Sequence, residues 1–334
     1  MKLLLHAAVL AVVVAMTGTG FAADEKKADS TPKIRVLIID GQNNHSWQAT
    51  TPLLKKVLED CGRFEVTVAT SPPALKRPMK PKDDKDEAAQ AKYKEELEKF
   101  KKDVEPPYKA ALAKFRPDLT KCDVVLSNYN GDLWSPEFQG DLEAALKGGK
   151  VALVIVHAAN NSFPGWGEYN QMIGLGWRDN KAGDRIVTDD KGAIVRVEKG
   201  QGPGSSHGAK HAFKVTVRDA EHPITKGMPR EWMHAPDELY HGLRGPAQNM
   251  HLLATAYSDK GKGGTGEHEP MIWTLSYGAG RVFHTPMGHD LDGMRCWGFI
   301  ATLQRGTEWA ATGKVTLPLP KEFPTADKVS QMPK

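Results

Sequence analysis

Cysteine is scarce in this chain, with three residues among 334. Cys61, Cys122 and Cys296 show no CxxC spacing, which excludes a zinc ribbon and a thioredoxin-like redox motif. None of them follows a predicted strand at the sharp turn where a nucleophilic cysteine would lie. Two interpretations stay open: a bridge between Cys61 and Cys122, or three buried thiols that pack as small hydrophobic side chains.

Two glycine-rich signatures are also missing. Residues 41–47 follow the first predicted strand but lack the GxGxxG spacing that lets a backbone approach a pyrophosphate. Residues 261–266 lack the GK[ST] ending of a P-loop, so we expect no nucleotide cofactor. The formal net charge of +4 is nearly balanced, whereas binding nucleic acid requires a concentrated basic surface. We therefore expect no nucleic-acid partner.

A long apolar run occurs only near the N-terminus. Residues 3–14 follow Lys2 and precede the small residues Gly20 and Ala22, a pattern typical of a signal peptide. The run is shorter than the roughly 20 residues that span a bilayer. We predict a cleaved signal peptide over residues 1–22 and a flexible lead-in over residues 23–32. The expected product is a periplasmic or extracellular protein with no membrane span.

Apolar periodicity predicts an α/β domain over residues 33–312. Residues 33–39 form a nearly continuous, β-branched apolar run typical of a buried strand. Residues 64–69 predict a second strand, and residues 46–60 between them carry the apolar face of a helix. This order favours parallel strands joined by a right-handed crossover. Further strands are predicted at 122–126, 151–156, 193–197, 213–217, 251–256, 271–275 and 280–284. A final helix over 293–312 and an extended tail over 313–334 complete the chain.

Residues 71–117 interrupt this alternation. The segment begins with several prolines and continues as a stretch rich in Lys and Glu with few large apolar residues. Pairs such as Glu95 with Lys99 are spaced to support a solvent-exposed helix. We predict a charged helical insertion on the surface. It serves either as a structural decoration, which charge runs favour, or as a partner-binding arm.

Several histidines stand where predicted strands end. His45 comes after the strand at 33–39, His157 directly follows the strand at 151–156, and His289 follows the strand at 280–284. In an open parallel α/β sheet, ligands bind outside the carboxyl ends of the strands, so these side chains are expected to converge. Imidazole is suited both to proton transfer near neutral pH and to metal ligation.

Other polar clusters could join this site. His207 and His211 have the HxxxH spacing of some zinc sites, but the glycine-rich surroundings predict a loop, so helical spacing cannot be assumed. Asp237, Glu238 and Tyr240 form an acid/base or hydroxyl-binding group, with a solvated loop as the alternative. Four tryptophans near strand ends suit either sugar stacking or the core. They are Trp47, Trp134, Trp166 and Trp177.

These segments together resemble the ThuA-like family of trehalose-utilisation proteins. The resemblance rests on residues 33–47, 149–159, 222–240 and 277–290, whose motifs HPITKG, DELY and YGAGRVFHTPMGHD are specific in combination. It implies a flavodoxin-like three-layer sandwich with a mostly parallel sheet, related to class I glutamine amidotransferases. It also implies a link to disaccharides, notably glycosides oxidised at the 3-position of a sugar ring. The catalytic cysteine of the amidotransferases is absent, which agrees with His157 at that turn.

We therefore predict an exported carbohydrate-processing protein that acts on glycosides or 3-keto-glycosides through a histidine-lined cleft. The predicted catalytic residues are His157, Asp237, Glu238 and His289. The predicted substrate-binding residues are His45, Trp47, Asn128, Tyr129 and Tyr240. A divalent metal such as Zn²⁺ is a candidate cofactor, with His45, His157 and His207 as its candidate ligands.

Two questions stay open at this point. The alternative function is a non-catalytic sugar-binding module on an amidotransferase-like fold that lacks the catalytic cysteine. The expected partner under either function is a small-molecule carbohydrate. Whether the chain forms a homo-oligomer is left open by the sequence.

Overall fold

The computed structural model describes residues 32–333, and residues 33–333 belong to one compact unit. The predicted signal peptide and the lead-in up to residue 31 lie outside the described residues. No helix among residues 32–333 is both long and apolar enough to cross a membrane.

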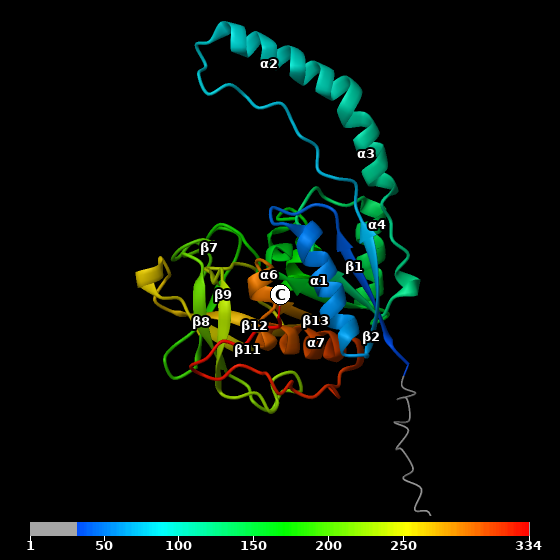
Figure 1. The fold of residues 1–334 in the computed structure, drawn as a ribbon. Coiled ribbons are helices and arrows are strands. Elements are labelled where there is room, and N and C mark those ends of the chain that lie inside the picture. The colour runs from blue at the N-terminus through cyan, green and yellow to red at the C-terminus, as the bar shows by residue number, and fades with distance from the viewer. Residues whose placement is uncertain (1–31, 334) are drawn as a thin grey trace, which may run out of the picture. The chain divides into compact units, whose positions relative to one another are not determined.

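The described residues contain strands, helices and four short helical turns (Figure 1). The strands are β1 (Ile34–Asp40), β2 (Phe64–Thr70), β3 (Val124–Ser127), β4 (Ala152–Val156), β5 (Arg185–Thr188), β6 (Ile194–Val197), β7 (Ser206–His207), β8 (His211–Val217), β9 (Glu231–Asp237), β10 (Tyr240–His241), β11 (Met250–Tyr257), β12 (His268–Tyr277) and β13 (Gly280–Thr285). The α-helices are α1 (Trp47–Asp60), α2 (Glu87–Lys99), α3 (Glu105–Lys114), α4 (Pro136–Lys147), α5 (Gly167–Ile173), α6 (Leu291–Met294) and α7 (Trp297–Thr312). The short turns are η1 (Phe100–Val104), η2 (Leu119–Lys121), η3 (His157–Asn161) and η4 (Lys260–Lys262).

One mixed sheet of eleven strands organises the fold, in the order β2-β1-β3-β4-β13-β12-β11-β8-β9, with β5 and β6 branching from β12. The strands from β2 to β13 are parallel, and those from β13 to β9 are antiparallel. The predicted α/β fold is confirmed. Its parallel strands occupy one half of the sheet, because the hairpin at residues 277–280 reverses the chain between β12 and β13.

Helices cover both faces of the sheet and make three layers. On one face, Leu54 and Leu58 of α1 pack in the same core as Phe299 and Leu303 of α7. On the other face, the core contains apolar side chains of α4 and α5. The serine before α4, Ser135, caps that helix by accepting a hydrogen bond from the amide of Phe138.

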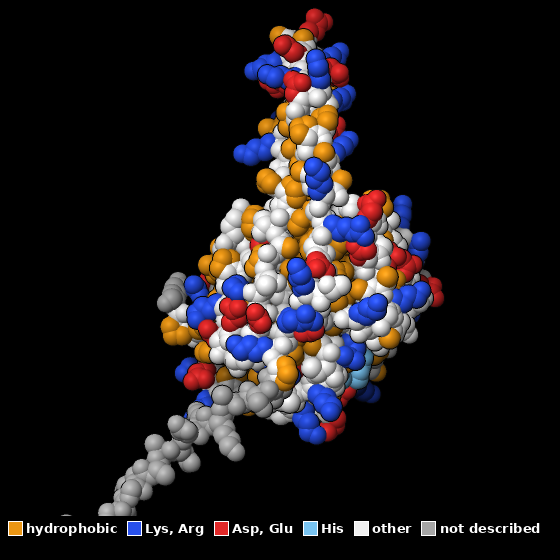
Figure 2. All heavy atoms as spheres, turned by 90° about the vertical axis from the view of Figure 1, so that its right-hand side faces the viewer, with side chains coloured by type: hydrophobic (Ala, Val, Ile, Leu, Met, Phe, Trp, Pro, Cys, Tyr) orange, Lys and Arg blue, Asp and Glu red, His pale blue; other side chains and the backbone are white. Residues whose placement is uncertain are grey.

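The charged segment at residues 71–117 forms an arm made of α2, η1 and α3 (Figure 1). Phe100 is the buried side chain of these three helical pieces. At the base of the arm, the Tyr108 hydroxyl donates to Asp132 and accepts from the Gln42 amide. Figure 2 shows charged side chains of both signs gathered at its tip. The arm is therefore joined to the domain by its base, next to the loop that follows β1.

Three expectations are settled or changed by the structure. The segment before Glu238 is strand β9 rather than a solvated loop. The predicted final helix is two helices, because Cys296 has extended backbone between α6 and α7. The three cysteines are free thiols in the described part of the chain, so the bridge between Cys61 and Cys122 is not formed.

Candidate metal centre and sugar site

Glu238 lies among four histidines at the carboxyl ends of the parallel strands. The Nε2 atoms of His289, His207 and His157 lie 3.3, 3.6 and 3.8 Å from its carboxylate oxygens. The ring of His45 lies 4.6 Å from that of His289 and 4.8 Å from that of His157. These five side chains come from segments far apart in the sequence. The histidines that follow separate strands therefore converge at this edge of the sheet, as expected.

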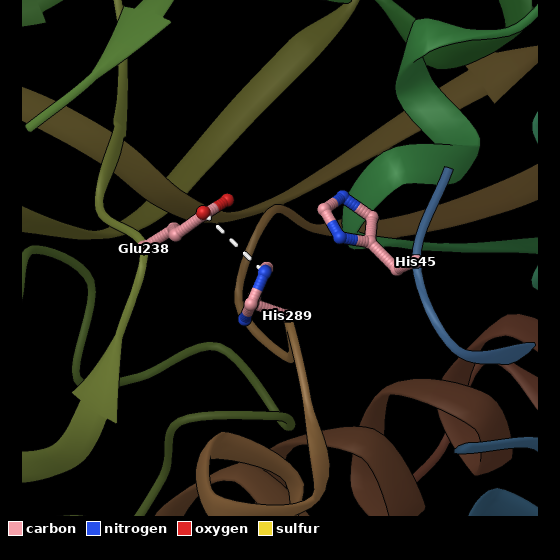
Figure 3. A group of neighbouring side chains, drawn as sticks. All are labelled: His45, Glu238 and His289. Carbon is pink, nitrogen blue, oxygen red and sulfur yellow. Dashed lines mark ion pairs between the residues drawn. The ribbon is translucent and has the colours of Figure 1, made fainter. Parts of the chain in front are cut away.

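Three of these residues form a group that could hold a metal ion. His45, Glu238 and His289 each offer one ligand atom, and these atoms all lie within 4.8 Å of one another (Figure 3). Two imidazoles and a carboxylate are a common ligand set of catalytic zinc, which keeps a further position open for water or substrate. All three side chains are partly exposed, so an ion and a small ligand can reach them.

This group differs from the predicted metal ligands. It shares His45 with them, but it includes Glu238 and His289, which we predicted as catalytic residues. The other two predicted ligands, His157 and His207, lie 3.8 and 3.6 Å from the carboxylate oxygens of Glu238.

His157 is held in one tautomer with a free lone pair. It begins η3 directly after β4 with φ of 46°, an unusual backbone for a residue with a side chain. Its Nδ1 donates to the carbonyl of Pro286 at 2.7 Å, so its Nε2 carries no proton. That Nε2 is buried without a hydrogen-bond partner among the described residues. Burial lowers the pKa of His157 to about 3, so the ring is neutral at physiological pH.

His45 is also kept neutral. Burial, together with the neighbouring His289, lowers its pKa to about 4. Its Nε2 lies 3.0 Å from the Asn44 amide nitrogen and 3.5 Å from the hydroxyl of Tyr240. Metals bind only the unprotonated imidazole, so neither His45 nor His157 must first release a proton near neutral pH.

His207 and the buried Tyr240 lie between the centre and Trp177. The Nδ1 of His207 donates to the carbonyl of Gly208, which leaves its Nε2 facing Glu238, and its side chain is 39% exposed. The ring of Tyr240 lies 4.2 Å from that of His157 and 4.6 Å from that of Trp177. The ring of His207 is therefore open to solvent, while Tyr240 links the centre to Trp177.

Asp237 lies behind the centre rather than in it. Its carboxylate is fully buried and accepts hydrogen bonds from the ring of His234 at 2.7 Å and from the amides of Gly288 and His289 at 2.7 and 3.1 Å. Burial alone raises the pKa of Asp237, but the hydrogen bond and charge of His234 outweigh it and bring the pKa to about 2. Asp237 thus ties the segment carrying Glu238 to the loop carrying His289.

The remaining predicted substrate-binding residues lie elsewhere. The Asn128 amide is buried and donates to the hydroxyls of Thr50 and Thr51 at the start of α1. Tyr129 is fully buried, and its ring packs 5.2 Å from that of Trp134. Trp47 is partly exposed at the first position of α1. Trp134 and Trp166 belong to the aromatic core, which leaves Trp177 as the tryptophan that contacts Tyr240 and His207.

Sequence reasoning did not separate the roles of Asp237 and Glu238. Successive side chains of a strand point to opposite faces, so the end of a strand at 231–237 would have placed one carboxylate inward and the other outward. The strand was not predicted from the sequence, because Pro236 is untypical of a strand. Arg178, which holds the turn containing His157, was also missed, because it stands in a loop with no recognisable pattern.

Comparison with known proteins decides the family. The model of the ThuA family, described as trehalose utilisation, matches residues 35–310. The chain belongs to the ThuA family. A ThuA-like protein from Parabacteroides merdae is 38% identical, with a TM-score of 0.76, over 90% of this chain and 98% of that one. A ThuA-like protein from Bacteroides uniformis is 16% identical, with a TM-score of 0.50, over 89% and 97% of the two chains. None of the curated proteins matches the chain.

The ThuA family membership confirms the resemblance that the motifs predicted. The matched segment contains Glu238 and all four histidines around it. The centre thus belongs to the ThuA domain itself and not to the segments on either side of it.

Proposed function

We propose that this ThuA-family protein is an exported, metal-dependent enzyme that cleaves glycosides oxidised at the 3-position of the sugar. The observation that carries the proposal is Glu238 surrounded by four imidazoles at the carboxyl ends of the strands. The family description, trehalose utilisation, supports a carbohydrate substrate. The apolar run at residues 3–14 supports export to the periplasm or the cell exterior.

The reaction needs a base and a group that polarises a carbonyl. The C3 carbonyl of a 3-keto-glycoside acidifies the neighbouring C2–H bond. Removal of that proton allows the bond between C1 and the glycosidic oxygen to break, and the departing oxygen takes up a proton. Addition of water across the resulting C1–C2 double bond gives a 3-keto sugar. The balance is one glycoside and one water to one 3-keto sugar and one alcohol.

The exposure and the hydrogen bonds of each residue indicate which of these tasks it performs. His45, Glu238 and His289 would hold a divalent metal, which supplies Lewis acidity to a carbonyl oxygen. His207 is the base in this proposal, because its Nδ1 donates to the Gly208 carbonyl, its Nε2 faces the centre beside Glu238, and its ring reaches solvent. The buried Nε2 of His157 accepts a hydrogen bond from a substrate hydroxyl and thereby orients the ring.

The test is product analysis with 3-keto-trehalose and the mature protein purified without a chelator. We expect free glucose and 3-keto-glucose by NMR. His207→Ala should lower kcat by at least about 100-fold while retaining bound metal. Glu221→Gln, a change at an exposed carboxylate, is the control and should behave like the wild type.

A different result separates the two candidate functions. If the protein binds the sugar but forms no product, and His157→Ala does not change binding, the enzyme proposal is wrong. The protein would then be a sugar-binding module. Product formation that survives His207→Ala unchanged would reject His207 as the base while leaving the reaction class in place.

A further inference from the structure

We infer that the cavity beside Trp177 is a subsite for a neutral pyranose ring, with the indole of Trp177 as its stacking surface. This inference rests on the proposed function, which supplies a sugar substrate for the neighbouring centre. The cavity has a volume of about 500 Å³ and is lined by Trp177, Arg178, Asp179, Asn180 and residues 202–205.

Trp177, which forms part of the cavity wall, also contacts two residues beside the metal centre. The ring of Trp177 lies 4.6 Å from that of Tyr240 and 5.9 Å from that of His207. Tyr240 in turn lies 4.2 Å from His157, and His207 faces the carboxylate of Glu238 at 3.6 Å. A disaccharide with one ring at the centre would extend its second ring towards Trp177.

The wall of the cavity is fixed to the turn that contains His157. Arg178 donates to the carbonyls of Asn160 and Asn161 at 3.0 Å each and to that of Ser162 at 2.6 Å. These carbonyls belong to η3 and to the residue that follows it. The subsite and His157 are therefore one rigid unit, as positioning a bound ring against the centre requires.

The charges of the cavity favour a neutral ligand over an anion. The hydrogen bonds of the buried Arg178 guanidinium go to backbone carbonyls and to the Asn170 side chain, so it is engaged in holding the wall. Asp179 adds an exposed carboxylate, which repels anions but accepts hydrogen bonds from hydroxyl groups. A sugar ring offers an apolar C–H face to an indole and hydroxyls at its edge, and it fits both features.

The experiment is calorimetric titration of the full-length mature protein with trehalose. Trp177→Ala should weaken binding by at least about tenfold, and Trp177→Phe should weaken it less, because a smaller aromatic face remains. Binding to the wild type should also change the tryptophan fluorescence, and this change should be lost in Trp177→Phe. Trp309→Phe, on the distant helix α7, is the matched control and should bind trehalose as the wild type does.

The outcomes distinguish this subsite from the proposed reaction. Trehalose binding that is equal in the wild type, Trp177→Ala and Trp177→Phe overturns the subsite, and so does a wild type that binds no trehalose. Metal content measured on each variant shows whether the centre is intact. If no 3-keto-glycoside is cleaved but trehalose binding still depends on Trp177, the proposed reaction fails and the subsite stands.

Discussion

The parallel and antiparallel halves of the sheet contribute different chemistry to one site. Strands β1 and β4 of the parallel half are followed by His45 and His157, which burial keeps neutral. The antiparallel half contributes Glu238 after β9, and β13 at the boundary leads to His289. The parallel half alone offers imidazoles without a charge to balance a cation. The candidate metal site thus depends on the extension that the antiparallel strands add.

Removing the charge that the antiparallel half supplies should have the largest effect. Glu238→Gln keeps the shape of the side chain but removes the carboxylate of the metal group, so Zn²⁺ affinity should fall by at least about 1,000-fold, beyond the loss typical of residues that only orient ligands. Competition with a chromophoric chelator measures the affinity. Glu231→Gln, at the other end of β9, is the control. Equal affinities for the two variants would show that Glu238 binds no metal.

The second largest effect should follow from removing the carboxylate of Asp237, which ties the segment carrying Glu238 to the loop carrying His289. Asp237→Asn leaves His234 without its buried carboxylate partner, and losing one member of such a pair costs about 3 kcal/mol of stability. The same change loosens the loop that carries His289, so metal affinity should fall as well. Urea unfolding and metal titration measure the two effects. Asp259→Asn, at an exposed turn, should change neither. Unchanged metal affinity in Asp237→Asn would mean that the loop is held by other contacts.

The same division explains how far the sequence predicted the molecule. Strands β1, β3 and β4 are nearly continuous apolar runs, and β2 at the edge of the sheet alternates apolar with polar residues, so all four were found from the sequence. His45 and His157, which follow β1 and β4, were found with them. Strand β9 contains Pro236 and polar residues, so its alternation of buried and exposed side chains could not be recognised in the sequence. The separation of Asp237 from Glu238 and the link of Arg178 to η3 depend on tertiary packing, which leaves no periodic signal in a single sequence.

Glu308 is a buried carboxylate outside the candidate site, and it serves as a reference for Glu238. It lies on α7 and accepts hydrogen bonds from the hydroxyl and the amide of Thr316, from the amide of Leu317 and from Arg63. Burial raises its pKa, but these hydrogen bonds outweigh burial and hold the pKa below its usual range. The ionised carboxylate therefore stabilises the folded protein above pH 4.5, the pKa of the group in the unfolded chain. This stabilisation is lost as the pH falls through the lower pKa of the folded state.

Glu308→Gln should accordingly destabilise the protein at pH 7 by about 1–2 kcal/mol, the cost of leaving buried donors poorly paired. The difference from the wild type should shrink as the pH falls below the unfolded value of 4.5 and through the lower pKa of the folded wild-type carboxyl. Urea unfolding at a series of pH values measures this difference. A difference that is constant from pH 7 to pH 3 would contradict a depressed pKa. Glu238→Gln should show no comparable loss of stability, because its carboxylate is partly exposed.

Shortening the arm should have the smallest effect on stability and on metal binding. Helix α2 buries no side chain, so replacing residues 83–99 by a short Gly/Ser linker, which keeps the buried Phe100, should change the free energy of unfolding by less than about 0.5 kcal/mol. This deletion keeps Tyr108, whose hydroxyl contacts Gln42 in the loop that leads to His45. Metal content should be unchanged. A deletion that loses metal while Tyr108→Phe retains it would show that the arm supports the parallel half beyond its hydrogen-bonded base. The site would then extend to a third region of the molecule.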